Sequence, residues 1–249
     1  MKGMKFKSLL VVAMGLCMLV SACGAGFLAS VPWITNATRN DVVNLGDSIF
    51  ALSGEESDYL HSYSGQTFRR YAVSGAEIAG GILAPDVGSQ YATAKNDDPN
   101  INTIFMDGGG NDILIPAAMF DPYNCKVDWW EWGRLSSKCK GLINDVYVDT
   151  VNVLNQMGRD GVDNIIFQGY YTPKFGLIGT TRLRQAVDYG DYKLAQAVAN
   201  ATAANNHRVF VDPRPYFNNS DIIIDGIHPS NSGSRKLADL VWAELGPLL

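Results

Sequence analysis

The stretch VVNLGDSIF (residues 42–50) joins an apolar run to a Gly-Asp-Ser turn. A short apolar run that ends in turn residues is typical of a buried strand. Gly46, Asp47 and Ser48 are ordinary turn residues, but they also place a serine hydroxyl directly after that strand. Whether Ser48 is only a turn residue or a nucleophile depends on its partners elsewhere in the chain.

Outward from this stretch, apolar runs alternate with longer segments of helical spacing. The sequence predicts strands at 41–45, 67–73, 101–106, 164–168 and 208–211, and helices at about 76–83, 142–157, 182–205 and 232–245. Strands separated by helices indicate βαβ units and a parallel sheet that is covered on both faces. The chain shows no internal repeat and no low-complexity linker. We therefore expect one α/β domain.

Ligands of such a sheet bind at the carboxyl ends of its strands, so the residues after each predicted strand matter. These residues are Gly46–Ser48, Ser74-Gly75, Gly108–Asp112 and Gly169–Tyr171, with Asp225–Pro229 preceding the last helix. We expect all five segments to converge on one rim. Together they hold the parts that hydrolysis through a serine requires.

Ser48 supplies the nucleophile, and His228 supplies a base that Asp225, three residues earlier, can orient. The backbone N–H groups of Ser48 and Gly75 and the side-chain amide of Asn111 are candidate oxyanion donors. Each piece has an ordinary alternative as a turn or packing residue. The presence of all of these residues at one predicted edge of the sheet favours a catalytic role over that alternative.

Other ligand and nucleophile motifs are absent or incomplete. Gly108–Asp112 resembles one copy of a calcium-binding glycine repeat, but no second copy follows. No serine has the Gly-x-Ser-x-Gly spacing of an α/β-hydrolase elbow, and no phosphate-binding loop is present. With three histidines in the whole chain, we expect no metal site.

The four blocks resemble the SGNH (GDSL-type) hydrolases. They are Gly46-Asp47-Ser48-Ile49, Gly75, Gly109-Gly110-Asn111-Asp112 and Asp225-Gly226-Ile227-His228-Pro229, and the resemblance spans residues 41–245. It implies a flavodoxin-like three-layer α/β/α sandwich with a central parallel sheet of about five strands. It also implies Ser48, Asp225 and His228 as the catalytic triad, an oxyanion hole from Ser48, Gly75 and Asn111, and no cofactor.

The N-terminus has the pattern of a secretory signal. Three lysines precede a short uncharged run, and Val20-Ser21-Ala22-Cys23 resembles a bacterial lipobox. We expect a signal peptide at 1–22, a lipidated tether at 23–39 and the hydrolase domain at 40–249, with an insertion at about 113–140. Gly24 after the cysteine favours delivery to the outer membrane. The alternative is a plain signal peptide that is cut after Ala22 or Ala25.

Removal of the signal leaves 17 basic and 25 acidic residues, a net charge of −8. An acidic chain without a basic cluster argues against nucleic acid as a partner. If Cys17 is removed and Cys23 is acylated, Cys125 and Cys139 are the two thiols left in an oxidising compartment. We expect them to form a disulfide, the alternative being two free buried cysteines.

Aromatic residues near the predicted rim are candidates for substrate binding. Trp129, Trp130 and Trp132 lie between the two cysteines, and Tyr170, Tyr171 and Phe175 follow the fourth strand. Alternatively, the tryptophans pack the insertion onto the domain, and the residues after the fourth strand belong to the core.

Two classes of function remain compatible with these patterns. The first is a lipid-anchored serine esterase of the cell envelope that acts on short-chain, lipid or carbohydrate-linked acyl esters, or an acyltransferase with the same triad. The second is a non-catalytic envelope protein that binds a ligand on the same fold. The complete set of Ser48, Gly75, Asn111, Asp225 and His228 favours the enzyme. The sequence carries no signal for an oligomeric state.

Overall fold

The apolar runs form a parallel sheet, as the sequence predicts. A computed structural model describes residues 30–249 except 53, 82, 129–132 and 203–206. Its strands are β1 (Arg39–Leu45), β2 (Phe68–Arg70), β3 (Thr103–Met106), β4 (Asn164–Gln168) and β5 (His207–Val211). They lie in the order β2-β1-β3-β4-β5, and every neighbouring pair is parallel.

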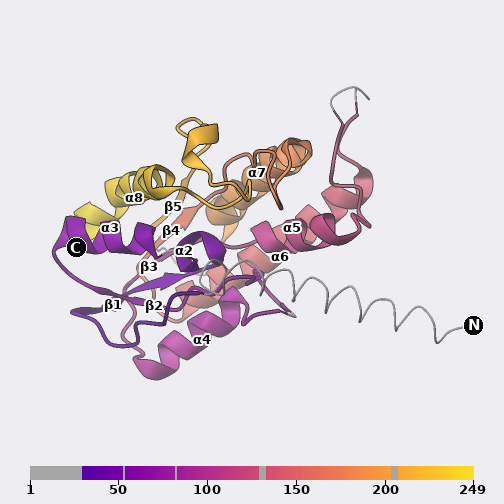
Figure 1. The fold of residues 1–249 in the computed structure, drawn as a ribbon. Coiled ribbons are helices and arrows are strands. Elements are labelled where there is room, and N and C mark those ends of the chain that lie inside the picture. Colours follow the sequence, from indigo (N-terminus) through magenta and orange to yellow (C-terminus); the bar gives the residue numbers. More distant parts are fainter. Residues whose placement is uncertain (1–29, 53, 82, 129–132, 203–206) are drawn as a thin grey trace, which may run out of the picture.

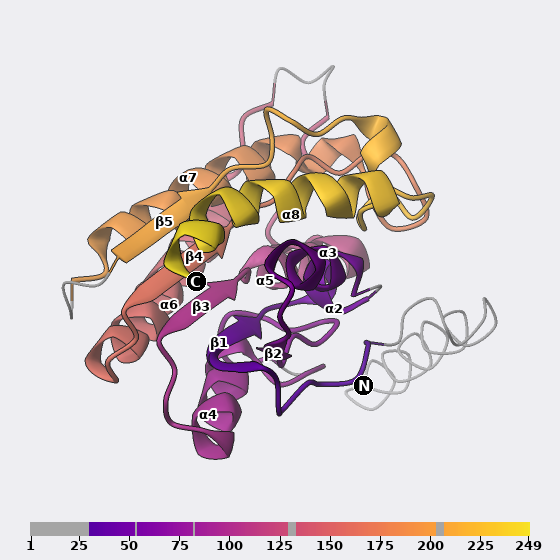
Figure 2. The same ribbon diagram turned by 90° about the vertical axis from the view of Figure 1, so that its left-hand side faces the viewer.

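Helices cover both faces of this sheet (Figures 1 and 2). One face packs against α4 (Val87–Asp97), α6 (Ser137–Arg159) and α7 (Arg184–Asn200). The other face packs against α2 (Ser48–Ala51), α3 (Glu55–Ser64) and α8 (Asn231–Leu245). The chain is therefore a three-layer α/β/α sandwich, and the prediction of the fold class is confirmed.

Alternate residues of the strands supply the two cores. Val43 and Ile104 pack toward α4, α6 and α7, whereas Val42 and Phe105 pack toward α2, α3 and α8. All four side chains are fully buried. A strand that is buried on both faces needs consecutive apolar residues. Such runs are the signal from which the sequence predicts these strands.

The described residues also form one further α-helix and short 3₁₀ helices. Helix α5 (Gly110–Met119) follows β3, and short 3₁₀ helices occur at η2 (Thr181–Leu183), η3 (Asn219–Asp221) and η4 (Gly246–Leu248). Among the described residues, none of the helices combines the length and the apolar character that crossing a membrane requires.

The predicted helix at 76–83 is wrong. The described part of this segment forms turns and bends, and helix α4 begins at Val87 instead. Gly80 has a left-handed φ of 72°, Pro85 disfavours a helical residue before it, and the Asp86 carboxylate caps α4 by accepting the Ser89 N–H at 2.6 Å. These three residues end the turn segment and start the helix later than the apolar spacing indicated.

Candidate active site

Ser48 is the first residue of α2 and follows the end of β1 after a two-residue turn. Asp47 is the N-cap of this short helix, and its Oδ1 accepts the N–H of Ile49 at 2.9 Å. Gly46 has φ 140°, and a Cβ there would lie 1.9 Å from Oδ1 of Asp107. Only glycine fits this turn, so the Gly-Asp-Ser sequence fixes where the serine is presented.

His228 and Asp225 meet Ser48 in a continuous chain of hydrogen bonds. Nε2 of His228 lies 2.9 Å from Oγ of Ser48, and Nδ1 of His228 lies 2.5 Å from Oδ2 of Asp225. An ionised carboxylate only accepts, so Nδ1–H donates to Asp225 and Nε2 accepts the serine O–H. Ser48 is 7% exposed and Asp225 is 1% exposed. The arrangement can move a proton from the serine to the imidazole.

The second oxygen of Asp225 holds the turn that carries His228. Oδ1 accepts the backbone N–H groups of Ile227 at 2.8 Å and His228 at 3.0 Å. Burial acts to raise the pKa of Asp225, but the hydrogen bond and charge of His228 and the two N–H donors outweigh it and lower the pKa. The carboxylate therefore stays ionised beside the imidazole.

The candidate oxyanion donors Asn111 and Gly75 are adjacent. Nδ2 of Asn111 donates one hydrogen to the carbonyl of Ala76 at 2.9 Å, which connects the first turn of α5 to the residue after Gly75. The second hydrogen of that amide has no acceptor among the described residues and can donate. Within the described part of the chain, neither the Ser48 nor the Gly75 backbone N–H has a hydrogen-bond acceptor.

A buried polar network below Ser48 was missed by the sequence reasoning. The Tyr170 hydroxyl donates to Oδ2 of Asp47 at 2.7 Å, and the Asp47 N–H donates to Oδ1 of Asp107 at 2.7 Å. Asp107 and Glu56 are almost fully buried, and Oδ2 of Asp107 and Oε1 of Glu56 have no partner among the described residues. Burial raises the pKa of both carboxyl groups well above the ordinary value.

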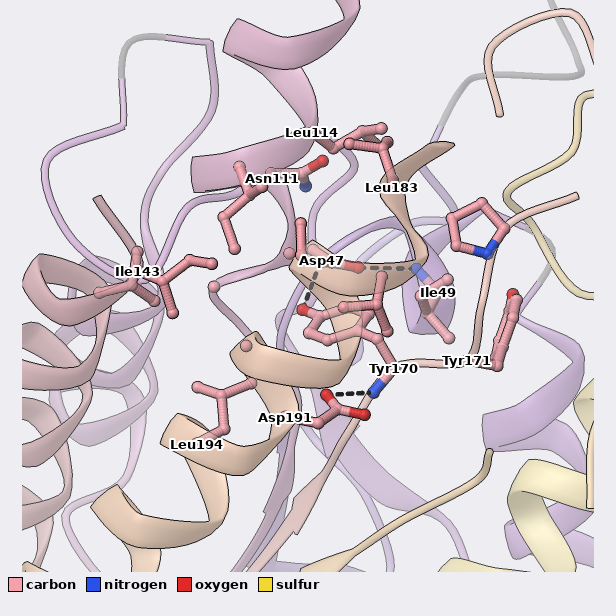
Figure 3. A pocket seen from close by; sticks show the side chains of 18 of the residues that line it. Asp47, Ile49, Asn111, Leu114, Ile143, Tyr170, Tyr171, Leu183, Asp191 and Leu194 are labelled. Atoms are coloured by element: carbon pink, nitrogen blue, oxygen red, sulfur yellow. Dashed lines mark hydrogen bonds between the residues drawn. The ribbon is translucent and has the colours of Figure 1, made fainter. Parts of the chain in front are cut away.

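A pocket opens beside the serine (Figure 3). Ser48 and Asn111 line it, together with aliphatic side chains from α5, α6 and the segment that leads into α7. Tyr170 and Tyr171 also line it, but the hydroxyl of Tyr171 is already bonded to the carbonyl of Ile227 at 2.6 Å. Both tyrosines therefore shape the wall of the pocket.

The remaining aromatic candidates for substrate binding are Phe175 and three tryptophans. Phe175 does not line the pocket and is 85% exposed, so this expectation is wrong. Phe175 lies in a surface loop whose backbone bonds to the segment around Asp225. Trp129, Trp130 and Trp132 fall outside the described residues.

Cys125 and Cys139 form a disulfide, as predicted, with the sulfurs 2.11 Å apart. Both residues are buried in a small apolar cluster with Ile143 of α6 and Ala186 of α7. The bond fixes the connection between α5 and α6 close to the wall of the pocket. Residues 113–119 of the expected insertion are part of α5.

The side chains around Ser48 offer nucleophilic and acid–base chemistry. The serine, imidazole and carboxylate provide a nucleophile and a base, and the amides provide donors for an anion. The described residues contain no group of three or more His, Cys, Asp and Glu side chains that could hold a metal ion.

Comparisons with known proteins give the class of this fold. No protein-family model matches the chain, and no curated protein matches it in sequence. Among solved structures, the chain is similar to a Slackia heliotrinireducens protein assigned to the SGNH hydrolases. That pair has a TM-score of 0.52 and 18% identity, and the match covers 82% of this chain and 96% of the other.

Two further solved structures match this chain over most of both lengths. One is a variant of an acetyl xylan esterase from Geobacillus stearothermophilus, with a TM-score of 0.52, 16% identity and coverage of 86% and 97%. The other is an inhibitor-bound aryl esterase from M. smegmatis, with a TM-score of 0.58, 12% identity and coverage of 84% and 99%. The chain therefore has the fold of the SGNH hydrolases.

Proposed function

We propose that this protein is a serine esterase that cleaves carboxylic esters through an acyl-enzyme intermediate. The observation that carries the proposal is the hydrogen-bond chain from Ser48 through His228 to Asp225. A ligand-binding protein would have no need for a buried carboxylate, an imidazole and a hydroxyl aligned in this order. The distant likeness to esterase structures agrees with this interpretation.

In the proposed reaction, Oγ of Ser48 attacks the ester carbonyl carbon while Nε2 of His228 takes the hydroxyl proton. The resulting oxyanion accepts hydrogen bonds from Asn111 and from the N–H groups of Ser48 and Gly75. The tetrahedral intermediate collapses, and His228 returns the proton to the departing alcohol. Water then attacks the acyl-serine with His228 again as base, which releases the acid and restores Ser48.

Turnover of p-nitrophenyl acetate by the full chain, purified in detergent, tests this proposal. We expect Ser48→Ala to lose on the order of 10³-fold or more in kcat, because only the donors and binding groups remain. Ser137→Ala, an exposed serine on α6, is the matched control and should behave as wild type. Equal rates for wild type and Ser48→Ala would leave ligand binding as the better interpretation.

We further propose that the chain is anchored to the cell envelope by a lipid on Cys23, with the domain outside the cytoplasm. This proposal rests on the signal-like residues 1–22 and the lipobox resemblance at Val20–Cys23. Gly24 favours the outer membrane. Cys23→Ser should release the protein from the membrane fraction, and unchanged membrane association would contradict the anchor.

A further inference from the structure

We propose that the pocket beside Ser48 holds the acyl chain of the substrate, and that Gly190 provides the room for a straight aliphatic chain longer than acetyl. The proposal rests on the esterase function above, because it assigns a substrate class to the same serine. It predicts esters of aliphatic fatty acids as substrates and makes Gly190 the residue that determines acyl-chain length.

The wall of the pocket is aliphatic on several sides. Helix α5 contributes Ile113 and Leu114, α6 contributes Ile143 and Val146, and α7 contributes Leu194. Ser48 and Asn111 line the same pocket, and Figure 3 shows Asn111, Leu114 and Leu194 around it. A methylene chain gains free energy from every carbon that it buries against such a surface, whereas a sugar hydroxyl would lose its hydrogen bonds there.

The acidic groups that line the pocket already have partners. Asp47 accepts hydrogen bonds from the Tyr170 hydroxyl and the Ile49 N–H. Oδ1 of Asp191 accepts the Tyr170 N–H at 3.0 Å, and its Oδ2 lies at ion-pair distance, 3.3 Å, from Nε of Arg214 without a hydrogen bond among the described residues. Asp47 is 2% exposed and Asp191 is 1% exposed, so neither carboxyl group is presented to a polar substituent of the ligand.

The lysine among the described lining residues is also engaged. The Lys193 ammonium lies over the rings of Tyr147 and Tyr189, 5.3 and 5.7 Å from their centres. The hydroxyl of Tyr147, which also lines the pocket, accepts the side-chain amide of Asn200 at 3.2 Å. Ser48 and Asn111 are therefore the lining groups that we assign to the polar atoms of the ester. The rest of the pocket fits an apolar group.

The position of His228 assigns this apolar group to the acyl side of the ester. The departing alcohol must receive its proton from Nε2 of His228, so the alcohol has to lie next to that ring. The pocket is lined by Ser48 and Asn111 but not by His228 or Asp225. The substituent that enters the pocket is thus the one that stays on the serine.

Gly190 lies within α7 and lines the pocket. A Cβ built there would make an ordinary contact with Cδ1 of Ile113 at 3.7 Å, with no other described side chain outside its chain neighbours within 4 Å, and the φ of Gly190 is not left-handed. Packing and backbone conformation therefore permit a side chain, although glycine in a helix interior is less stable than alanine. A larger side chain at Gly190 would extend from α7 into the pocket that this residue lines and would reduce the room for a ligand.

Rates for the p-nitrophenyl esters of acetate, butyrate and octanoate test the proposal in the full chain. Wild type should gain up to about fourfold in kcat/KM for each methylene that the pocket buries. Gly190→Val should lower the octanoate-to-acetate ratio of kcat/KM at least about tenfold, which equals the loss of two buried methylenes. Ala199→Val adds the same side chain at an exposed position of α7 and should keep the wild-type ratio.

A second variant covers the case in which Gly190→Val does not fold. Leu114→Ala enlarges the pocket and should raise the dodecanoate-to-octanoate ratio of kcat/KM.

A second set of substrates, ethyl and octyl acetate, varies the alcohol instead of the acyl group. Gly190→Val should leave the ratio of kcat/KM for these two esters unchanged. If Ser48-dependent turnover occurs but neither variant alters acyl preference, or if only the alcohol preference changes, this proposal is wrong. If no ester shows Ser48-dependent turnover, the esterase function itself has failed.

Discussion

The hydroxyl of Tyr170 donates a hydrogen bond to Oδ2 of Asp47 at 2.7 Å, which joins the segment after β4 to the residue before Ser48. The other oxygen of Asp47 caps α2 through the Ile49 N–H. Tyr170 therefore restrains the turn that presents the nucleophile. Its ring also explains Gly110, because a Cβ at that position would lie 2.7 Å from the ring carbons.

Tyr170→Phe should destabilise the fold by about 1–3 kcal/mol, because it leaves a buried carboxylate oxygen of Asp47 without its donor. The urea midpoint of unfolding measures the change. Tyr216→Phe removes a hydroxyl from an exposed side chain and is the matched control. An unchanged midpoint in Tyr170→Phe would show that the hydrogen bond does not support the turn.

Asp225→Asn should reduce kcat on the order of 10⁴-fold with little change in KM. An amide can donate to Nδ1 of His228 and so favours the tautomer whose Nε2 carries a proton and cannot accept one from Ser48. Steady-state kinetics with p-nitrophenyl butyrate measure this effect. A loss below about tenfold would argue against Asp225 as the residue that orients the base.

Asn111→Ala should lower kcat by about 100- to 1000-fold, because it removes one of three proposed oxyanion donors. Since Nδ2 also bonds to the carbonyl of Ala76, the variant loses a contact that positions Gly75. Asn144→Ala, an exposed amide on α6, controls for the substitution itself. A rise in KM with kcat unchanged would assign Asn111 to substrate binding instead.

Asp112 makes stability depend on pH. Burial raises its pKa to about 7 although the carboxylate accepts the Ile78 N–H at 3.0 Å. The unfolded chain has an ordinary pKa near 3.9, so it releases this proton first as the pH rises. Between about pH 4 and pH 7 Asp112 is ionised in the unfolded chain but still protonated in the folded one, so the free energy of unfolding falls as the pH rises. Above about pH 7 Asp112 is ionised in both states, and its contribution no longer changes with pH.

Asp112→Asn should therefore lose less stability than wild type when the pH is raised from about 5 to about 8. Urea midpoints at the two pH values give the comparison, and Asp145→Asn on the exposed face of α6 is the control. Equal pH dependence in wild type and Asp112→Asn would contradict the burial argument.

The strands and the rim were predictable because they rest on local patterns. Buried parallel strands need consecutive apolar residues. Gly46–Ser48 and Asn111 follow β1 and β3, and Asp225–His228 shortly precedes helix α8. Helix α3 was missed because its sequence EESDYLHSYS is mostly polar, with Leu60 as its fully buried apolar residue. Its contact with α8 stabilises it, and that contact is not visible in a local window.

The supporting groups of the site were not predictable, because they depend on which strands are neighbours. Tyr170 meets Asp47 across the sheet edge, and Asp107 meets the Asp47 N–H because β3 lies beside β1. Gly190 lines the pocket because α7 packs with this residue next to Ile113 of α5, and that packing is not visible in the sequence around Gly190. In the sequence, Asp107 follows an apolar run directly, and this was the one available signal for its burial.

Activation of Ser48 by His228 can be measured as the mass of the full chain after treatment with a fluorophosphonate, followed by peptide mapping. This reagent modifies serines that a neighbouring base activates. We expect one adduct, located on Ser48 and absent from His228→Ala. No adduct on Ser48, or equal labelling of Ser48 in His228→Ala, would contradict the activation of this serine by His228.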